Sequence, residues 1–318
     1  MTFHPDELPD LSGKVYLVTG GNSGIGYFTV ARLAQHGAHV YMGVRSVEKG
    51  SAAVKDIKKL YPNAKISLLE INHMSLDSVV AAAKLFISKE PALHGLINNA
   101  GIMATPFEIS SDGYEAQFQT NYLAHWLLTT HLLPLLLKTS KTTPAGGVRI
   151  VNLSSAGHAS APSCGINFAD PALTKSDPGA RYGQSKLANI LHTKILSDRY
   201  GPNSPSAKAG NGEVWTTSVH PGLVETNLAN NSKWPFPLGL ILNVARPLGF
   251  FFDADKGSWT SVYCAASPKM PSQDCGAYFI RIAKNKGGWR SGPSKNAALA
   301  TKLEEWTSKE LNKNGWLP

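Results

Sequence analysis

Cysteine is scarce in this chain, and that scarcity limits the compartments and chemistries that fit it. The 318 residues include only Cys164, Cys264 and Cys275. These thiols form no C-x-x-C pair and are too few for a disulfide framework. A reducing compartment is the simpler interpretation, and we expect a cytoplasmic protein whose thiols pack rather than react. We also expect no metal site.

Long apolar runs are missing as well. No uninterrupted stretch reaches the roughly 18 residues that predict a membrane span. The nearest candidate, residues 234–252, is broken by three prolines and by Arg246. The first ten residues are polar and contain two prolines, which is not the pattern of a signal peptide. The sequence therefore predicts neither a transmembrane span nor a leader.

A clustered block of positive charge is also absent, although the net charge is +9. Lys and Arg are dispersed and are not interleaved with aromatic residues. This pattern favours a solvated basic surface over a nucleic-acid interface. It remains compatible with an anionic small molecule, including a phosphorylated cofactor.

Short apolar runs alternate with longer helical patterns along most of the chain. This repetition, with short connections, predicts a parallel sheet covered by helices on both faces. We expect one α/β domain over residues 1–318, of the Rossmann-type doubly wound class with a mostly parallel seven-stranded sheet. The expected strands are 15–19, 40–44, 66–69, 93–97, 148–153, 214–219 and 277–280. The expected helices are 25–36, 47–60, 76–88, 114–137, 182–200, 256–266 and 301–311.

A Gly-rich segment, Thr19-Gly20-Gly21-Asn22-Ser23-Gly24-Ile25-Gly26, connects the first strand to the first helix. Gly20 allows a tight turn, and Gly24 and Gly26 let the backbone approach a pyrophosphate at a helix N-terminus. An ordinary Gly-rich turn is the alternative. The position in the first strand–helix unit favours a dinucleotide cradle.

The end of the second strand indicates which dinucleotide is bound. A carboxylate there would accept the ribose 2′-hydroxyl of NAD, but residues 40–47 contain no Asp or Glu. Arg45 is present instead, and a guanidinium can pair with a 2′-phosphate. The sequence thus predicts NADP(H), with an exposed arginine of no such role as the alternative.

A phenol and an ammonium lie one helical turn apart in Tyr182-Gly-Gln-Ser-Lys186. The ammonium is expected to lower the tyrosine pKa from about 10. Ser155 ends the fifth strand, where such sheets present ligand-binding groups, and alternation turns Ser154 to the other side. These residues predict proton transfer beside a bound cofactor.

Six motifs occur in one order along residues 11–278, and together they resemble the classical short-chain dehydrogenase/reductase family. They are Thr19-Gly-x-x-x-Gly24-x-Gly26, Asn98-Asn-Ala-Gly101, Asn121, the strand end at 150–155, Tyr182-x-x-x-Lys186 and Pro221-Gly222. Within the family the chain is similar to the retinol-dehydrogenase-like group and to fungal reductases. That narrower resemblance is carried by Arg45, residues 155–158, residues 182–189 and the His220-Pro-Gly-x-Val-x-Thr226 segment.

The resemblance implies four catalytic roles. Tyr182 would be the general acid or base, and Lys186 would lower its pKa and hold the nicotinamide ribose. Ser155 would polarise the carbonyl, and Asn121 would hold a water in a proton relay. Glu70 stands where the family more often has Asp beside the adenine. The implied cofactor-binding residues are Gly20, Asn22, Ser23, Gly24, Ile25, Gly26, Arg45, Glu70, Ile71, Asn98, Ala100, Gly101, Tyr182, Lys186, Pro221, Gly222, Val224 and Thr226.

We therefore expect an NADP(H)-dependent oxidoreductase that interconverts a small hydrophobic ketone or aldehyde and its alcohol. Residues 223–253 match the family's variable substrate lid; a dimer contact and a membrane-touching patch are the alternatives. Residues 281–318 form a tail. The helix beginning at Tyr182 matches the family's usual dimer surface, so a homodimer is possible. An NADPH-binding pocket used for a non-redox rearrangement of an unsaturated substrate, and an NADPH sensor, are the alternative functions.

Overall fold

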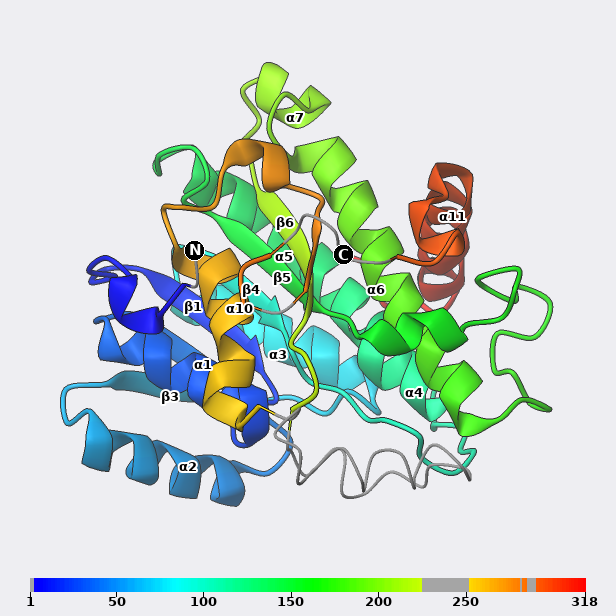
Figure 1. The fold of residues 1–318 in the computed structure, drawn as a ribbon, viewed down its shortest axis with the longest axis horizontal. Coiled ribbons are helices and arrows are strands. Elements are labelled where there is room, and N and C mark those ends of the chain that lie inside the picture. The colour runs from blue at the N-terminus through cyan, green and yellow to red at the C-terminus, as the bar shows by residue number, and fades with distance from the viewer. Residues whose placement is uncertain (1–2, 225–251, 281, 285–289) are drawn as a thin grey trace.

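A seven-stranded parallel sheet forms the centre of the computed structural model, which describes residues 3–224, 252–280, 282–284 and 290–318 (Figure 1). The strand order is β3-β2-β1-β4-β5-β6-β7, and each adjacent pair is parallel. The expected doubly wound fold is confirmed. The strands are β1 (Val15–Thr19), β2 (His39–Val44), β3 (Lys65–Glu70), β4 (Gly95–Asn98), β5 (Arg149–Leu153), β6 (Trp215–His220) and β7 (Tyr278–Ile280).

Helices cover both faces of this sheet. Helices α1 (Gly24–Gln35), α2 (Val47–Leu60) and α10 (Ala254–Ala266) share one buried apolar cluster. Helices α3 (Leu76–Lys89), α5 (Ala124–Ser140), α6 (Pro178–Tyr200) and α11 (Ala297–Lys313) share the other. Within the described residues, no helix is both long enough and apolar enough to cross a membrane. Shorter elements are η1 (Pro5–Glu7), α4 (Ala116–Phe118), η2 (Gln119–Leu123), η3 (Ala156–Ser160), α7 (Pro205–Lys208), η4 (Ser272–Asp274) and η5 (Pro293–Lys295).

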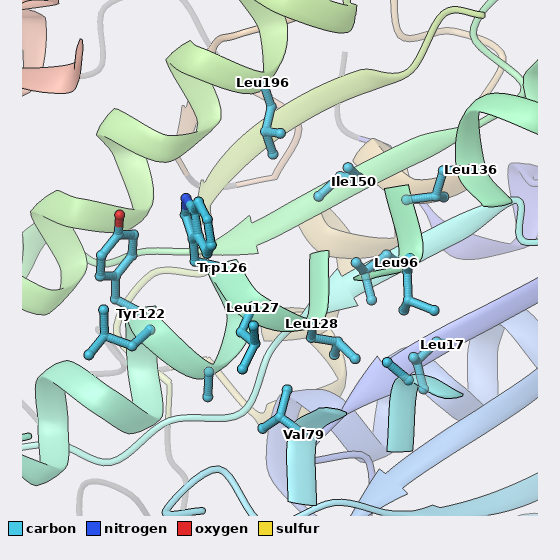
Figure 2. Close-up of a cluster of buried hydrophobic side chains, with 14 of the residues drawn as sticks. Leu17, Val79, Leu96, Tyr122, Trp126, Leu127, Leu128, Leu136, Ile150 and Leu196 are labelled. Carbon is cyan, nitrogen blue, oxygen red and sulfur yellow. The ribbon is translucent and has the colours of Figure 1, made fainter. Parts of the chain in front are cut away.

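The register of the sheet is set by a row of buried aliphatic side chains. Leu17 of β1 pairs with Leu96 of β4, which pairs with Ile150 of β5. All three face the cluster that contains Leu127 and Leu128 of α5 (Figure 2). Burying each such side chain stabilises the fold by about 1.5–3 kcal/mol, and a one-residue slip would expose the row. The carboxyl ends of the strands are thereby aligned at one edge.

Local signals explain most helix boundaries. The Ser75 side chain accepts a hydrogen bond from the Ser78 amide and caps α3, and Ser46 caps α2 in the same way. Pro134 lies inside α5 and does not end it. The expected helix over 114–137 consists of α4, the wide π turn η2 and α5. The connection between α6 and β6 contains α7.

The segment expected to be a lid, 223–253, lies mostly outside the described residues. Its two ends are described, and they meet: the Phe252 amide donates to the Leu223 carbonyl oxygen at 2.8 Å, and Val224 forms a parallel bridge with Phe252. The intervening chain therefore leaves and returns at one place, at the carboxyl end of β6.

Candidate active site

A cleft of about 600 Å³ opens at the aligned carboxyl ends of the strands. This volume is within the range of small-molecule sites, and the position is where such folds bind ligands, near the reversal of strand order between β1 and β4. The lining residues are Gly20, Asn22–Gly26, Gly43–Ser46, Lys49, Ile71–Met74, Asn99–Ile102, Thr105, Glu108, Thr120, Leu153, Ser154, Tyr182, Lys186 and Pro221.

The Gly-rich turn forms the floor of the cleft. Gly20 has φ +65°, and a Cβ on Gly26 would lie 2.2 Å from the Gly20 carbonyl oxygen, so these positions exclude other residues. The Thr19 hydroxyl accepts hydrogen bonds from the amides of Asn99 and Ala100, at 2.9 Å each. The turn after β1 is thus tied to the turn after β4, with the N-terminus of α1 at the cleft. This geometry fits a pyrophosphate.

Two cations line the cleft next to β2. Arg45 directly follows that strand, and Lys49 lies one turn into α2, whose N-cap is Ser46. Glu70, at the end of the neighbouring strand β3, is exposed and is not among the lining residues, although Ile71 is. The charges at this end of the cleft favour an anionic group such as a phosphate.

Tyr182 and Lys186 of α6 lie together at the other end of the cleft, with Lys186 Nζ 5.7 Å from the centre of the Tyr182 ring. Burial raises the pKa of Tyr182 to about 12, and hydrogen bonding to Ser155 lowers it in part. Burial lowers the pKa of Lys186 to about 8. The lowered tyrosine pKa expected from the spacing is not found, because desolvation of the phenolate dominates in the protein without ligands.

Ser154 and Ser155 have different partners, as alternation predicts. The Ser154 hydroxyl donates to the Lys186 carbonyl oxygen at 2.7 Å and is therefore engaged in holding α6. The Ser155 hydroxyl accepts from the Gly157 amide at 3.0 Å and lies beside the Tyr182 phenol. A Cβ on Gly157 would lie 2.8 Å from the Tyr182 ring, so a glycine there permits this approach.

Asn121 lies in the π turn η2, and its amide group is bound to the chain. Its Nδ2 donates to the Ile102 carbonyl oxygen at 3.0 Å and to the Ser185 hydroxyl at 2.9 Å, and its Oδ1 accepts from the Ile102 amide. A Cβ on Gly101 would contact both Asn121 Oδ1, at 3.0 Å, and Lys186 Nζ, at 3.4 Å. The asparagine and the lysine are therefore neighbours behind the turn after β4.

Some predicted cofactor residues do not line the cleft. Asn98 is buried and donates to Thr129 and Asn152, so its neighbour Asn99 faces the cleft instead. Gly222 and Val224 are outside the lining, and Thr226 is outside the described residues. The other predicted residues, Gly20, Asn22, Ser23, Gly24, Ile25, Gly26, Arg45, Ile71, Ala100, Gly101, Tyr182, Lys186 and Pro221, line it.

Sequence reasoning missed several lining residues, which are Ser46, Lys49, Asn72, His73, Met74, Thr105, Glu108 and Thr120. Ser46, Asn72, His73 and Met74 closely follow strand ends and Lys49 lies one helical turn further on, so their signal was positional, whereas Thr105, Glu108 and Thr120 are distant from any strand end. Lys49 could have been found by extending the search for cations past Arg45 into α2.

Comparison with known proteins gives consistent matches. The short chain dehydrogenase family description matches residues 14–168. The chain is 49% identical over 312 residues to the short-chain dehydrogenase/reductase drtF of Aspergillus calidoustus, covering 97% of each chain. It is 37% identical over 297 residues to mouse retinol dehydrogenase 11, covering 92% of this chain and 84% of that protein. A crystal structure of a Mycobacterium paratuberculosis protein superposes with a TM-score of 0.71 at 29% identity, covering 97% and 98% of the two chains.

The chain belongs to the short-chain dehydrogenase/reductase family. This short-chain dehydrogenase/reductase is accordingly an oxidoreductase that acts on CH–OH or C=O groups, and its family uses NAD(H) or NADP(H). The retinol-dehydrogenase-like resemblance is likewise confirmed.

Because Lys186 is buried, we expect the stability of this short-chain dehydrogenase/reductase to depend on pH. Its folded pKa of about 8 lies below the ordinary 10.5, so the unfolded chain binds more protons between these values and stability rises with pH there. Below pH 8 the buried charge costs about 3 kcal/mol. Lys186→Met should therefore raise the free energy of unfolding at pH 7 by up to that amount, since Asn189 still donates to the Leu153 carbonyl oxygen.

Urea denaturation of wild type and Lys186→Met, without ligands, at pH 7 to 10.5 measures this effect. The difference in free energy of unfolding between wild type and Lys186→Met should become smaller above pH 8. Lys194→Met is the control, because Lys194 lies on the same helix but is partly exposed. Its free energy of unfolding should differ little from that of wild type. A difference for Lys186→Met that stays constant with pH would contradict the prediction.

Proposed function

We propose that this protein is an NADP(H)-dependent oxidoreductase that interconverts a hydrophobic ketone or aldehyde and its alcohol, with Tyr182 as general acid and base. One observation carries the proposal. A single cleft is lined by a glycine cradle with two cations at one end and by the Tyr182–Lys186 pair at the other. Ser155 is not among the lining residues, but it lies beside the Tyr182 phenol.

The cofactor, when bound, supplies or accepts the hydride. The protein's residues handle the oxygen of the substrate. Ser155 donates a hydrogen bond to the carbonyl oxygen as negative charge develops there. Tyr182, whose pKa is about 12, keeps its proton at neutral pH and transfers it to the new alkoxide. Lys186, close to the ring, then stabilises the phenolate. In the oxidation direction the phenolate form of Tyr182, which the Lys186 charge stabilises, accepts the alcohol proton.

Residues at the β1 and β2 ends would hold the cofactor. Gly20, Gly24 and Gly26, which line the cleft at the N-terminus of α1, would hold the pyrophosphate. Arg45 and Lys49 would pair with the 2′-phosphate.

Arg45→Ala should weaken NADPH binding by about 10- to 100-fold, because a hydrogen bond to a charged group contributes about 1.5–3 kcal/mol. NADH, which lacks the 2′-phosphate, should lose less than about threefold by the same argument. Isothermal titration of both cofactors against wild type and variant measures the two ratios. Glu48→Ala, a neighbouring charge change, is the control. Equal losses for both cofactors would argue against this role for Arg45.

The substrate would bind at the Tyr182 end, near the two described ends of the segment 223–253. The ends of this segment meet at Val224 and Phe252. Val224 packs against Gly257 of α10, which in turn lies near Ile25 of the glycine turn. The segment therefore starts and ends next to the cleft. Its composition is apolar, and the name of the mouse relative, retinol dehydrogenase 11, refers to an apolar alcohol. Both points support a hydrophobic substrate.

A further inference from the structure

His158 is a buried histidine three residues after the proposed catalytic Ser155. It lies in η3, the short helix that follows β5, and its relative exposure is 1%. The segment 155–158 carries part of the narrower family resemblance, yet the proposed mechanism uses only the serine of that segment. A buried polar ring needs hydrogen-bond partners, so the partners of His158 indicate what it does.

The two nitrogens of the His158 ring join the catalytic serine to the C-terminal tail. Nδ1 lies 2.7 Å from the Ser155 carbonyl oxygen, and Nε2 lies 3.2 Å from the Ser291 backbone nitrogen. A carbonyl oxygen accepts hydrogen bonds and a backbone amide donates them. Nδ1 therefore carries the ring proton and Nε2 accepts from Ser291. Both bonds exist together only when the ring is neutral and in this one tautomer.

The surroundings of the His158 ring keep it neutral and in place. Burial lowers the pKa of His158; the bond to Ser155 offsets part of this shift, and the nearby Arg290 charge adds to it. The Tyr278 ring of β7 packs edge-on against the imidazole, with 5.3 Å between the ring centres. At neutral pH the ring is thus a fixed hydrogen-bonding group and not a source of protons.

The contact of His158 with Ser155 fixes the backbone of the serine. The Ser155 carbonyl oxygen also accepts a hydrogen bond from the His158 amide, at 3.0 Å, so one residue holds this oxygen twice. The Ser155 hydroxyl accepts from the Gly157 amide and lies beside the Tyr182 phenol. Its own proton is then available to a substrate oxygen. The direction of that proton depends on how the serine backbone is held.

The chain is closely packed on both sides of the bond between His158 and the tail. A Cβ on Gly183 of α6 would lie 2.5 Å from the Ala161 amide nitrogen, so the end of η3 contacts the backbone of α6. A Cβ on Gly165, shortly after η3, would lie 2.5 Å from the Leu299 side chain and 3.0 Å from Pro293. The part of the tail that contains η5 and the start of α11 is therefore a firm support for the ring.

We propose that His158 is a positioning residue that holds Ser155 in place for the reaction, with the tail at Ser291 as its anchor. This inference rests on the proposed function, in which the serine donates to the substrate oxygen. That hydrogen bond strengthens as charge develops on the oxygen. A displaced serine should therefore lower kcat and leave NADPH binding unchanged. Part of the tail thus supports catalysis through His158.

A double-mutant cycle tests whether His158 acts through Ser155. His158→Ala should lower kcat by about 10- to 100-fold, the range for a reacting group displaced by about 1 Å. Ser155→Ala should lower it by about 10²- to 10³-fold, as expected for a lost oxyanion donor. In the double variant, His158→Ala should add less than about twofold, because no hydroxyl remains to be positioned. Isothermal titration should show NADPH affinity within about twofold of wild type in His158→Ala.

The probe is NADPH with acetophenone, cyclohexanone or benzaldehyde, whichever wild type reduces fastest. Two conservative variants separate the contacts of the ring. The amide of His158→Asn stands near the place of Nδ1 and can donate to Ser155, whereas the amide of His158→Gln stands near the place of Nε2 and can accept from Ser291. His158→Asn should recover most of the kcat that His158→Ala loses, and His158→Gln should recover little. If His158→Ala does not fold, the cycle is run with His158→Gln.

His131→Ala is the matched control. His131 of α5 is also a buried histidine bonded to the tail, with Nε2 2.8 Å from the Trp316 carbonyl oxygen, and it does not line the cleft. Its variant should lose stability to urea as His158→Ala does, because each removes one bond to the tail. Its kcat should stay within about twofold of wild type.

Four results would overturn the positioning role. They are an unchanged kcat in His158→Ala, the same loss from His158→Ala with and without the Ser155 hydroxyl, a larger recovery in His158→Gln than in His158→Asn, and an equal loss of kcat in His131→Ala. In each case wild type still reduces the carbonyl with NADPH, so the proposed function stands. If wild type reduces none of the three carbonyls, the proposed function fails and the positioning role fails with it.

Discussion

Tyr182→Phe should lower turnover by about 10²- to 10⁴-fold while NADPH binding changes little, because the variant loses only the proton that general acid catalysis requires. The phenylalanine ring can still pack against Gly157 and below Lys186, as the tyrosine ring does. The phenol lies beside Ser155 at one end of the cleft. Steady-state rates with a panel of ketones, together with NADPH titration, measure the two quantities.

A second phenol provides the control for this experiment. Tyr16 of β1 is almost fully buried and does not line the cleft. Tyr16→Phe should therefore leave turnover within about threefold of wild type, the range of an ordinary mild substitution of about 0.5 kcal/mol. Full turnover in Tyr182→Phe would refute the proposed mechanism. Loss of NADPH binding equal to the loss of turnover would assign Tyr182 to cofactor binding instead.

Glu304→Ala should destabilise the fold by roughly 3 kcal/mol, because this carboxylate joins three helices in a buried setting. Glu304 of α11 accepts hydrogen bonds from the Trp126 indole at 2.8 Å and from Arg199 at 2.6 Å. His192 lies 3.8 Å away. Burial by itself raises the pKa of Glu304, but the His192 ring, the Trp126 indole and the Arg199 charge outweigh it and lower the pKa to about 2.

Urea denaturation tests this prediction, with Glu305→Ala as the control, since Glu305 is the exposed neighbour on the same helix. The folded pKa is below the ordinary 4.5, so the stabilisation is present above pH 4.5 and is lost as pH falls toward 2. The difference in free energy of unfolding between wild type and Glu304→Ala should become smaller as pH falls from 4.5 toward 2. If Glu305→Ala were as destabilising as Glu304→Ala, the buried contacts would not be the cause.

The parts of the fold that could be predicted are those whose sequence signals are contiguous in the chain. The strand–helix alternation and the Gly20–Gly26 turn are contiguous patterns, so the sheet and the cradle could be predicted. The spacing of Tyr182 and Lys186 correctly placed them together. It could not give the direction of the tyrosine pKa shift, because burial depends on segments distant in sequence. Asn98 faces the core and Asn99 the cleft, which a shared motif does not distinguish.

Residues that belong to no motif could not be predicted from the sequence, for a similar reason. His73 and Thr120 come from different segments, and both line the cleft where the Gln119 side chain of η2 bonds to the His73 carbonyl oxygen. The role of α11 was also missed. Residues Arg181–Thr193 of α6 are all buried within one chain, and α11 packs along this helix (Figure 1). The helix predicted to offer a dimer surface is thus already covered over these residues.

This packing has a consequence for the order in which the protein is completed during synthesis. Tyr122 and Trp126, side by side in the core (Figure 2), bond to Thr307 and Glu304, which follow 185 and 178 residues later. Such distant contacts form late, because the intervening chain must first be made and ordered. While the ribosome is still translating α11, the helix that carries Tyr182 and Lys186 has an uncovered apolar flank. A nascent chain paused before residue 297 would therefore contain every proposed catalytic residue and still be a substrate for chaperones rather than a finished enzyme.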